Sequence, residues 1–274
     1  MNTLRNQALQ LLLTRDPEAK AKGTMGLDLT GGAPGSAEVM AEPAGIPGRP
    51  AHPELVPHTQ LKTRSVRNPA GHAALIHALA HIELNAIDLA LDVAWRFPGM
   101  PDEFYLDWLN VAKEEALHFT LLRKHLVSLG FDYGHFPAHN SLWEMAEKTK
   151  GDLLARIALV PRTMEARGLD ASPPIKAKLL TIDDQRGADI LDIILRDEIG
   201  HVAVGNKWYR VLCADRGLDP LSTYAELAAA FNAPRLKGPF NMEARRAAGF
   251  EEEELYALEQ FWTSKHEDPE MKPR

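Results

Sequence analysis

Two glutamate–histidine pairs lie within long apolar stretches of this chain. Glu115-x-x-His118 occurs in AKEEALHFTLL, and Glu198-x-x-His201 occurs in LRDEIGHVAVG. On a helix, residues three apart lie one turn from each other on nearly the same face. A carboxylate and an imidazole at this spacing can therefore bind a common metal ion.

A single glutamate precedes each pair at a matching distance. Glu83, in HIELNAIDLA, lies 32 residues before Glu115, and Glu165, in PRTMEARGL, lies 33 residues before Glu198. One carboxylate from each of two helices, with Glu-x-x-His from two others, is the ligand set of di-iron and di-manganese carboxylate bundles. We therefore predict six metal ligands: Glu83, Glu115, His118, Glu165, Glu198 and His201.

The chemistry of such a centre accounts for these residue types. Carboxylates are hard ligands that bridge two cations and offset their charge, and imidazoles complete the coordination. An ionised carboxylate among apolar side chains, as around Glu83, is costly unless it is paired or bound to metal. The predicted cofactor is two metal ions, iron first, with Mn/Fe or Mn/Mn pairs as alternatives. The sequence identifies no catalytic residue beyond these ligands, and we predict no other cofactor-binding residue.

The ligand set has open alternatives. Glu165 is its weakest member, because Pro161, four residues earlier, should kink the helix by removing a hydrogen bond. Asp170 could take its place. Glu114 and Asp197 each lie four residues before the histidine of a pair and could compete for the ligand role.

Other candidate residues have a plain structural interpretation as well. His125 follows His118 by seven residues and shares its face, which suits either a place beside the metal or packing in the core. Four basic residues in PRLKGPFNMEARR could hold an anionic substrate near the mouth of a bundle, or simply be solvated: Arg235, Lys237, Arg245 and Arg246.

Long helices must position these residues. Asn68-Pro69, an N-cap followed by proline, opens a predicted helix that stops before Pro98-Gly99. Ser141-x-x-Glu144 has the capping-box pattern and opens the third. The predicted long helices are 69–97, 101–129, 141–168, which could resume after Gly168, and 173–217, which should break near Gly187.

Shorter segments flank the long helices. Residues 3–14 are predicted to form a short amphipathic helix. Residues 23–57 are rich in Gly and Pro, which indicates an extended arm or a disordered tail. The last segment contains one or two short helices that should pack on the rest. The sequence predicts an all-α, ferritin-like four-helix bundle with an N-terminal arm and a C-terminal helical extension, divided as 1–60, 61–217 and 218–274.

Composition narrows the functions. The 274 residues carry a formal charge of −7, with a sequence pI near 5.9, which disfavours broad binding to nucleic acid or anionic membrane. Cys213 is the one cysteine, so this chain alone forms no disulfide, Cys-based zinc site or iron–sulfur cluster. The N-terminal segment lacks signal-peptide features, and five acidic or histidine residues interrupt the longest apolar stretch. We expect a soluble, cytoplasmic protein.

Seven strings between residues 47 and 258 carry a family resemblance: PGRP, HALAHIELNAIDLALD, FYLDWLNVAKEEALHF, YGHFPAH, ARGLD, DEIGHVAVGNKWY and GPFNMEARRAAGF. They resemble a bacterial ferritin-like family known as domain of unknown function 455. More distantly, the chain is similar to tRNA-modifying non-haem di-iron hydroxylases that act on a prenylated adenosine. The resemblance implies a ferritin-like bundle with the six ligands named above, and it leaves the reaction open.

The favoured hypothesis is an oxidoreductase whose di-metal centre activates dioxygen to oxidise or hydroxylate an unidentified substrate, either a small molecule or a modified nucleoside. An external electron donor is the expected partner, and the chain could form a homo-oligomer. A ferroxidase or iron-handling protein is one alternative. A non-catalytic ferritin-like scaffold is the other.

Overall fold

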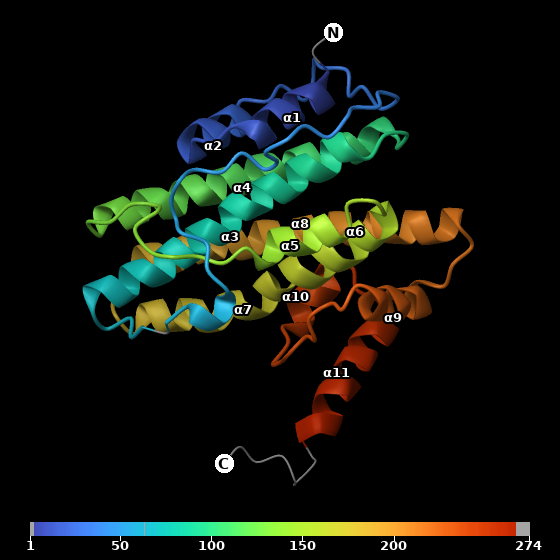
Figure 1. The fold of residues 1–274 in the computed structure, drawn as a ribbon. Helices are drawn as coiled ribbons and strands as arrows, with labels where there is room; N and C mark the ends of the chain where they lie inside the picture. Colours follow the sequence, from blue (N-terminus) through green and yellow to red (C-terminus); the bar gives the residue numbers. More distant parts are fainter. Residues whose placement is uncertain (1–2, 63, 267–274) are drawn as a thin grey trace. The chain divides into compact units, whose positions relative to one another are not determined.

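The computed structural model describes residues 3–62 and 64–266, which form helices joined by loops (Figure 1). Within these residues, β-structure is limited to one isolated parallel bridge between Leu55 and Ala138. The prediction of an all-α protein is confirmed.

The chain divides into two compact units. Unit 1 comprises Met1–Lys150 and Lys176–Ile194, and unit 2 comprises Gly151–Ile175 and Leu195–Arg274. The boundaries fall inside two helices, α7 (Arg167–Leu180) and α8 (Gln185–Asp215), so each of these helices contributes residues to both units.

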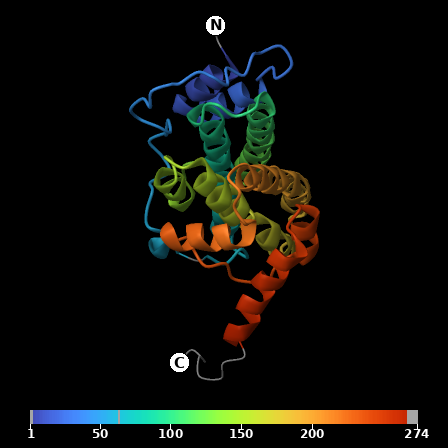
Figure 2. The ribbon, with the colours of Figure 1, turned by 90° about the vertical axis from the view of Figure 1, so that its right-hand side faces the viewer.

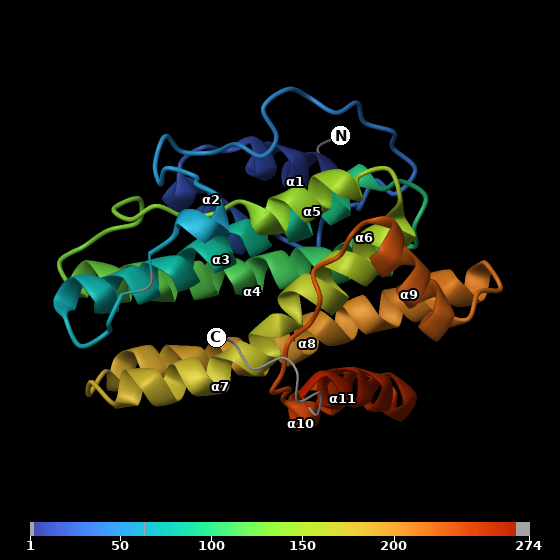
Figure 3. The ribbon, with the colours of Figure 1, turned by 60° about the horizontal axis from the view of Figure 1, so that its bottom comes forward.

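Two long helices form the centre of unit 1. They are α3 (Pro69–Arg96) and α4 (Asp102–Ser128), which lie side by side in Figures 1 and 3. As predicted, the Asn68 side chain accepts a hydrogen bond from the Gly71 amide and caps α3. By length and composition α3 could cross a membrane, but 78% of its most apolar window is buried inside the protein. That burial is typical of a core helix.

Two short helices cover α3 and α4 in unit 1. They are α1 (Leu4–Leu13), which was predicted, and α2 (Pro17–Met25), which was not (Figure 2). The extended arm follows, with a single 3-10 turn, η1 (His58–Gln60). Its backbone is held in place, because the Gly48 amide donates to Leu12 O at 2.8 Å and the Val56 amide donates to Ala138 O at 2.8 Å.

The third predicted helix is divided in the structure. It consists of α5 (Ser141–Lys148), α6 (Leu153–Leu159) and a π-helix, η2 (Val160–Glu165), before α7 begins. The predicted continuous helix 141–168 is therefore wrong, and helical structure continues through Gly168, because α7 begins at Arg167. The capping box is not formed, because Ser141 is the first helical residue and the N-cap is Asn140, whose side chain makes no capping bond.

The fourth predicted stretch also differs from the structure. Its start at Pro173 is wrong, because this proline lies inside α7. The expected break occurs at residues 181–184, slightly before Gly187. The Asp184 carboxylate accepts from the Gly187 amide at 2.8 Å and so caps the start of α8.

The C-terminal segment belongs to unit 2 and has three helices in its described part, where one or two were predicted. It contains α9 (Pro220–Ala230), α10 (Met242–Ala247) and α11 (Glu252–His266). The Asn206 amide group of α8 donates to Ala248 O at 2.8 Å, and Arg245 of α10 forms an ion pair with Asp170 of α7. A small apolar core supports these polar contacts, formed by Ala166, Leu169, Val202, Ala244 and Ala248.

Candidate metal site

Three of the six predicted ligands meet in unit 1. Glu83 comes from α3, and Glu115 and His118 come from α4. His118 Nδ1 lies 3.3 Å from Glu83 Oε2 and 3.3 Å from Glu115 Oε2. All three side chains are buried, so two carboxylates share one imidazole away from water.

Burial and mutual proximity shift the pKa values of this group. The pKa of Glu83 is raised, first by burial and then by the neighbouring Glu115 carboxylate. For His118, burial opposes the charged form, but the adjacent carboxylates of Glu115 and Glu83 outweigh it and raise the pKa. Without a metal, the protonated His118 imidazole therefore carries a positive charge that interacts with both carboxylates.

The geometry fits a metal ion. Two ligand atoms about 2.1 Å from one cation lie roughly 3.0–3.4 Å apart for bond angles between 90° and tetrahedral, which matches the 3.3 Å separations around His118. Glu83 Oε2 is buried and makes no hydrogen bond to another described residue, although it faces the imidazole. A buried carboxylate oxygen with spare acceptor capacity is what a cation would satisfy.

Unit 2 contains the second Glu-x-x-His pair. Glu198 and His201 are both buried on α8, with Glu198 Oε2 3.9 Å from His201 Nδ1. Gly168 of α7 lies beside the glutamate, since a Cβ atom at this position would be 3.8 Å from the Glu198 carboxyl carbon. Glu165, three residues before Gly168, is half-buried at the last position of the π-helix.

The π-helix accommodates Pro161 without ending the helical path. The Ala166 amide donates to Pro161 O at 3.1 Å, five residues back, and the wider turn changes the direction in which the following side chains point. Arg162 holds the segment in place through a 2.5 Å hydrogen bond to Asn206 Oδ1 and an ion pair with Glu254. The predicted kink at Pro161 is therefore a π-helix that leads directly into Glu165.

The structure gives the alternative acids other partners. Asp170 accepts from Arg245 at 2.6 Å and from the Asn241 amide at 2.8 Å, so its carboxylate is already engaged. Glu114 and Asp197 are half-buried, and Asp197 accepts from Arg196 at 2.8 Å.

The expectation for the basic loop is partly wrong. Arg245 is buried and paired with Asp170 rather than open to an anionic substrate. Arg235 and Lys237 are exposed, and Arg246 is paired with Glu252, in keeping with a solvated loop.

Sequence reasoning missed a second buried group in unit 1. His72, His125 and Asp184 each offer a potential ligand atom, and these atoms lie within 4.8 Å of one another. His125 was singled out only for the face that it shares with His118. The three residues lie at helix ends far apart in the chain, so no local spacing indicates their proximity.

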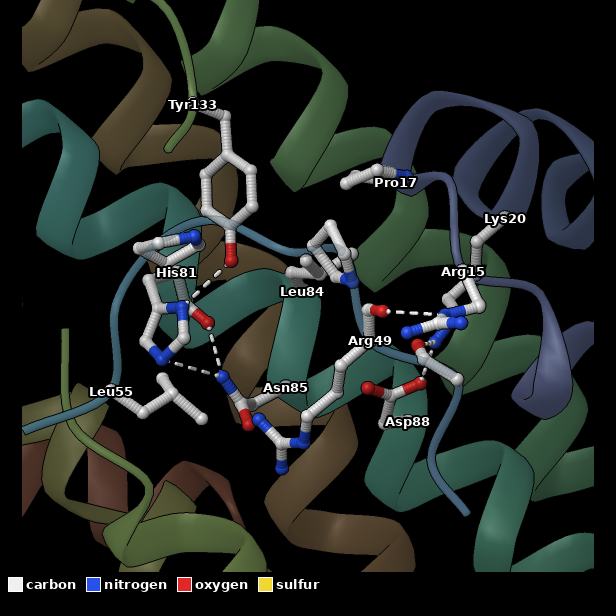
Figure 4. A pocket seen from close by; sticks show the side chains of 13 residues that line it. Arg15, Pro17, Lys20, Arg49, Leu55, His81, Leu84, Asn85, Asp88 and Tyr133 are labelled. Carbon is white, nitrogen blue, oxygen red and sulfur yellow. Dashed lines mark hydrogen bonds and ion pairs between the residues drawn. The ribbon is translucent and has the colours of Figure 1, made fainter. Parts of the chain in front are cut away.

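The pocket in Figure 4 lies where the arm covers α3. It measures about 30 Å³, room for one or two water molecules, and is lined by Arg49, His81 and Asp88 among others. The Asn85 side-chain oxygen in its wall is buried and makes no hydrogen bond to another described residue. This cavity suits ordered water and is too small for a substrate.

Comparison with known proteins places the chain in a family. One relative, an uncharacterized protein from Haemophilus influenzae (strain ATCC 51907 / DSM 11121 / KW20 / Rd), is 48% identical over 221 residues, which cover 77% of each chain. No solved structure matches this chain. The model of the family described as "Protein of unknown function (DUF455)" matches residues 13–256. Since this match covers most of the sequence, the chain belongs to that family.

Proposed function

We propose that the protein is a di-iron carboxylate oxidoreductase with a ferritin-like four-helix bundle. In this proposal one carboxylate-bearing helix and one Glu-x-x-His helix from each half of the repeat supply the ligands. The six ligands are Glu83, Glu115, His118, Glu165, Glu198 and His201.

One observation carries the proposal. Glu83 and Glu115 are buried with an oxygen each 3.3 Å from the same nitrogen of His118, the spacing of ligands around a single cation. The second Glu-x-x-His pair, Glu198 and His201, is buried as well. Three buried glutamates, Glu83, Glu115 and Glu198, would be strongly destabilising without cations to offset them.

The residues and the metal would divide the work. When bound, iron supplies the redox chemistry for reducing dioxygen. The glutamates neutralise the cationic charge, and His118 and His201 provide neutral nitrogen donors once their Nδ1 protons have left. An external reductant must supply electrons, because the single cysteine, Cys213, gives the chain no cysteine pair of its own. The substrate is a small molecule or a modified nucleoside.

Metal analysis and spectroscopy test the proposal. The full chain, expressed with iron and purified without added metal, should contain about two iron ions and change its absorption spectrum on reduction and on exposure to oxygen. Glu115→Gln should abolish both properties. Glu114→Gln removes a carboxylate from the adjacent position of the same helix and should leave them intact.

The same measurements separate the competing functions. Mineral loading far beyond two ions per chain would favour an iron-storage protein. Iron content below one tenth of an ion per chain, with Glu115→Gln and Glu114→Gln indistinguishable, would show that the scaffold binds no metal here and would refute the proposal.

A further inference from the structure

A second group of metal-ligand side chains lies entirely within unit 1. His72 is near the start of α3, His125 is near the end of α4, and Asp184 immediately precedes α8. Asp184 Oδ2 lies 2.6 Å from His72 Nε2 and 2.8 Å from His125 Nε2. The histidines near the ends of two helices thus both contact one carboxylate oxygen at the start of a third.

The donor types suit a zinc-like ion. Two imidazole nitrogens and one carboxylate oxygen, with a water in the fourth position, form a familiar three-ligand zinc arrangement. A tetrahedral ion with bonds of about 2.0 Å separates its ligand atoms by roughly 3.3 Å. The two nitrogens would therefore have to withdraw from Oδ2 by about 0.5–0.7 Å relative to the present 2.6 and 2.8 Å. Small side-chain rotations can supply that movement.

The surroundings orient the ligands in a way that is common around bound metals. The second oxygen of Asp184 accepts from the Gly187 amide at 2.8 Å, which fixes the plane of the carboxylate. The Ser128 hydroxyl lies 3.4 Å from His125 Nδ1, the nitrogen that would carry the proton while Nε2 binds metal. A Cβ atom at Gly187 would come within 2.4 Å of Asp184 Oδ2, so glycine leaves the ligand oxygen its space.

The group is partly open to solvent and lies apart from the carboxylate centre around His118. The His72 side chain is 14% exposed, whereas His125 and Asp184 are each 5% exposed, so an ion and its water would enter from the His72 side. His125 follows His118 on α4 by seven residues, which is about 10.5 Å along the helix axis. This group is therefore distinct from the carboxylate centre around His118.

We propose that His72, His125 and Asp184 form a second metal site, one that binds a single divalent zinc-like ion with one coordination position left to water. The ion links the start of α3, the end of α4 and the start of α8. The site is independent of the di-iron proposal, because it shares no ligand with it.

Cobalt and zinc binding to the full chain test this site. The double variant Glu115→Gln/His118→Gln removes carboxylate-centre ligands, so Co²⁺ absorption in that background reports the second site. After treatment with a chelator, both this variant and the natural chain should bind Co²⁺ at the second site, with the intense visible bands of four-coordinate cobalt, and Zn²⁺ should abolish these bands.

The decisive variant is His125→Gln. Glutamine keeps an N–H donor for Asp184 but offers no nitrogen lone pair, so a purely hydrogen-bonded cluster would tolerate it. We expect Zn²⁺ affinity to fall by about 100-fold or more, as loss of even a supporting residue costs up to about that much. His58→Gln, at an exposed histidine, should leave affinity unchanged.

The outcomes are distinct from those of the iron experiment. Equal Zn²⁺ affinity in His125→Gln and His58→Gln, or no Co²⁺ band in either background, would overturn the second site. A chain that takes up no iron but keeps the band that His125→Gln removes would refute the di-iron proposal and support this one.

Discussion

At the scale of single residues, this protein buries ionisable side chains away from water. Glu83 and Glu115 are buried against His118, whose raised pKa keeps a proton between them. Two histidines of α3 have the opposite shift, a lowered pKa. Burial first of all lowers the pKa of His77 and of His81 to about 4. Two neighbouring helices therefore hold imidazoles in opposite protonation states, neutral for His77 and His81 on α3 and protonated for His118 on α4.

Burial is the main cause of the lowered pKa values, and each ring also makes hydrogen bonds. His77 Nε2 accepts from the Gly134 amide at 2.9 Å. His81 Nδ1 pairs with the Tyr133 hydroxyl at 2.7 Å, while Nε2 lies 2.9 Å from His139 O and can donate to it. Protonation of His77 would place an N–H where its ring has to accept from Gly134, whereas the Tyr133 hydroxyl could accept from a protonated His81.

We predict that stability falls as the pH is lowered from about 6.5 to about 4. In that window an unfolded histidine takes up a proton, whereas His77 and His81 in the folded chain do not. Protons then favour the unfolded state, by at most about 1.4 kcal/mol per pH unit for each histidine. The measurement is urea unfolding at pH 7, 6 and 5.

The histidine variants make this pH prediction specific. His77→Gln keeps an acceptor for the Gly134 amide but cannot titrate, so its free energy of unfolding should depend less steeply on pH. His58→Gln, at an exposed position, is the control and should keep the natural slope. Identical slopes for the His77 variant and the natural chain would contradict the assignment.

At the scale of elements, local rules located most of the long helices but not every break. The bounds of α3 and α4 follow from Asn68-Pro69, Pro98-Gly99 and Gly130, whose effects are local. The break at residues 149–152 and the π-helix at Pro161 were not predictable in this way. The π-helix is held by contacts of Arg162 with Asn206 and Glu254, which are distant in sequence.

Arg5 of α1 connects the extended arm to an element far along the chain. Its buried guanidinium donates to Ala94 O at 3.1 Å and to Trp95 O, among the last carbonyls of α3, which lack helical partners. It also donates to Gly35 O, at 2.8 Å, in the arm. We predict that Arg5→Lys lowers the free energy of unfolding by about 3 kcal/mol, because an ammonium cannot serve these carbonyls together.

Urea unfolding of the full chain measures this effect. Arg15→Lys, an exposed arginine of the same region, should stay within about 0.5 kcal/mol of the natural chain. If Arg5→Lys changed stability as little as the control does, the guanidinium would not be what fastens the arm.

At the scale of the whole molecule, the di-iron proposal links metal content to stability. Cations that bind the folded chain alone stabilise it by mass action, by about 2.7 kcal/mol when free metal is 100 times the dissociation constant. We predict that removing iron with a chelator lowers the midpoint of thermal unfolding of the natural chain. The comparison is made by scanning calorimetry of the iron-loaded and the chelated protein.

Two variants control for unspecific effects of the chelator. Glu114→Gln should keep the difference between loaded and chelated protein, and Glu115→Gln should lose it. Equal midpoints with and without iron in the natural chain would mean that iron does not hold the buried carboxylates.

The sequence by itself determined the helical class and the boundaries of α3 and α4, because helix periodicity and capping depend on near neighbours. It also grouped Glu83 with Glu115 and His118, because a glutamate on one helix and Glu-x-x-His on the next match half of a recurring metal-ligand set. Only the tertiary structure decided the π-helix before Glu165, the pairing of Asp170 with Arg245, and the cluster of His72, His125 and Asp184. These features join residues tens of positions apart, whose contacts follow from the packing of whole helices and leave no spacing pattern in the chain.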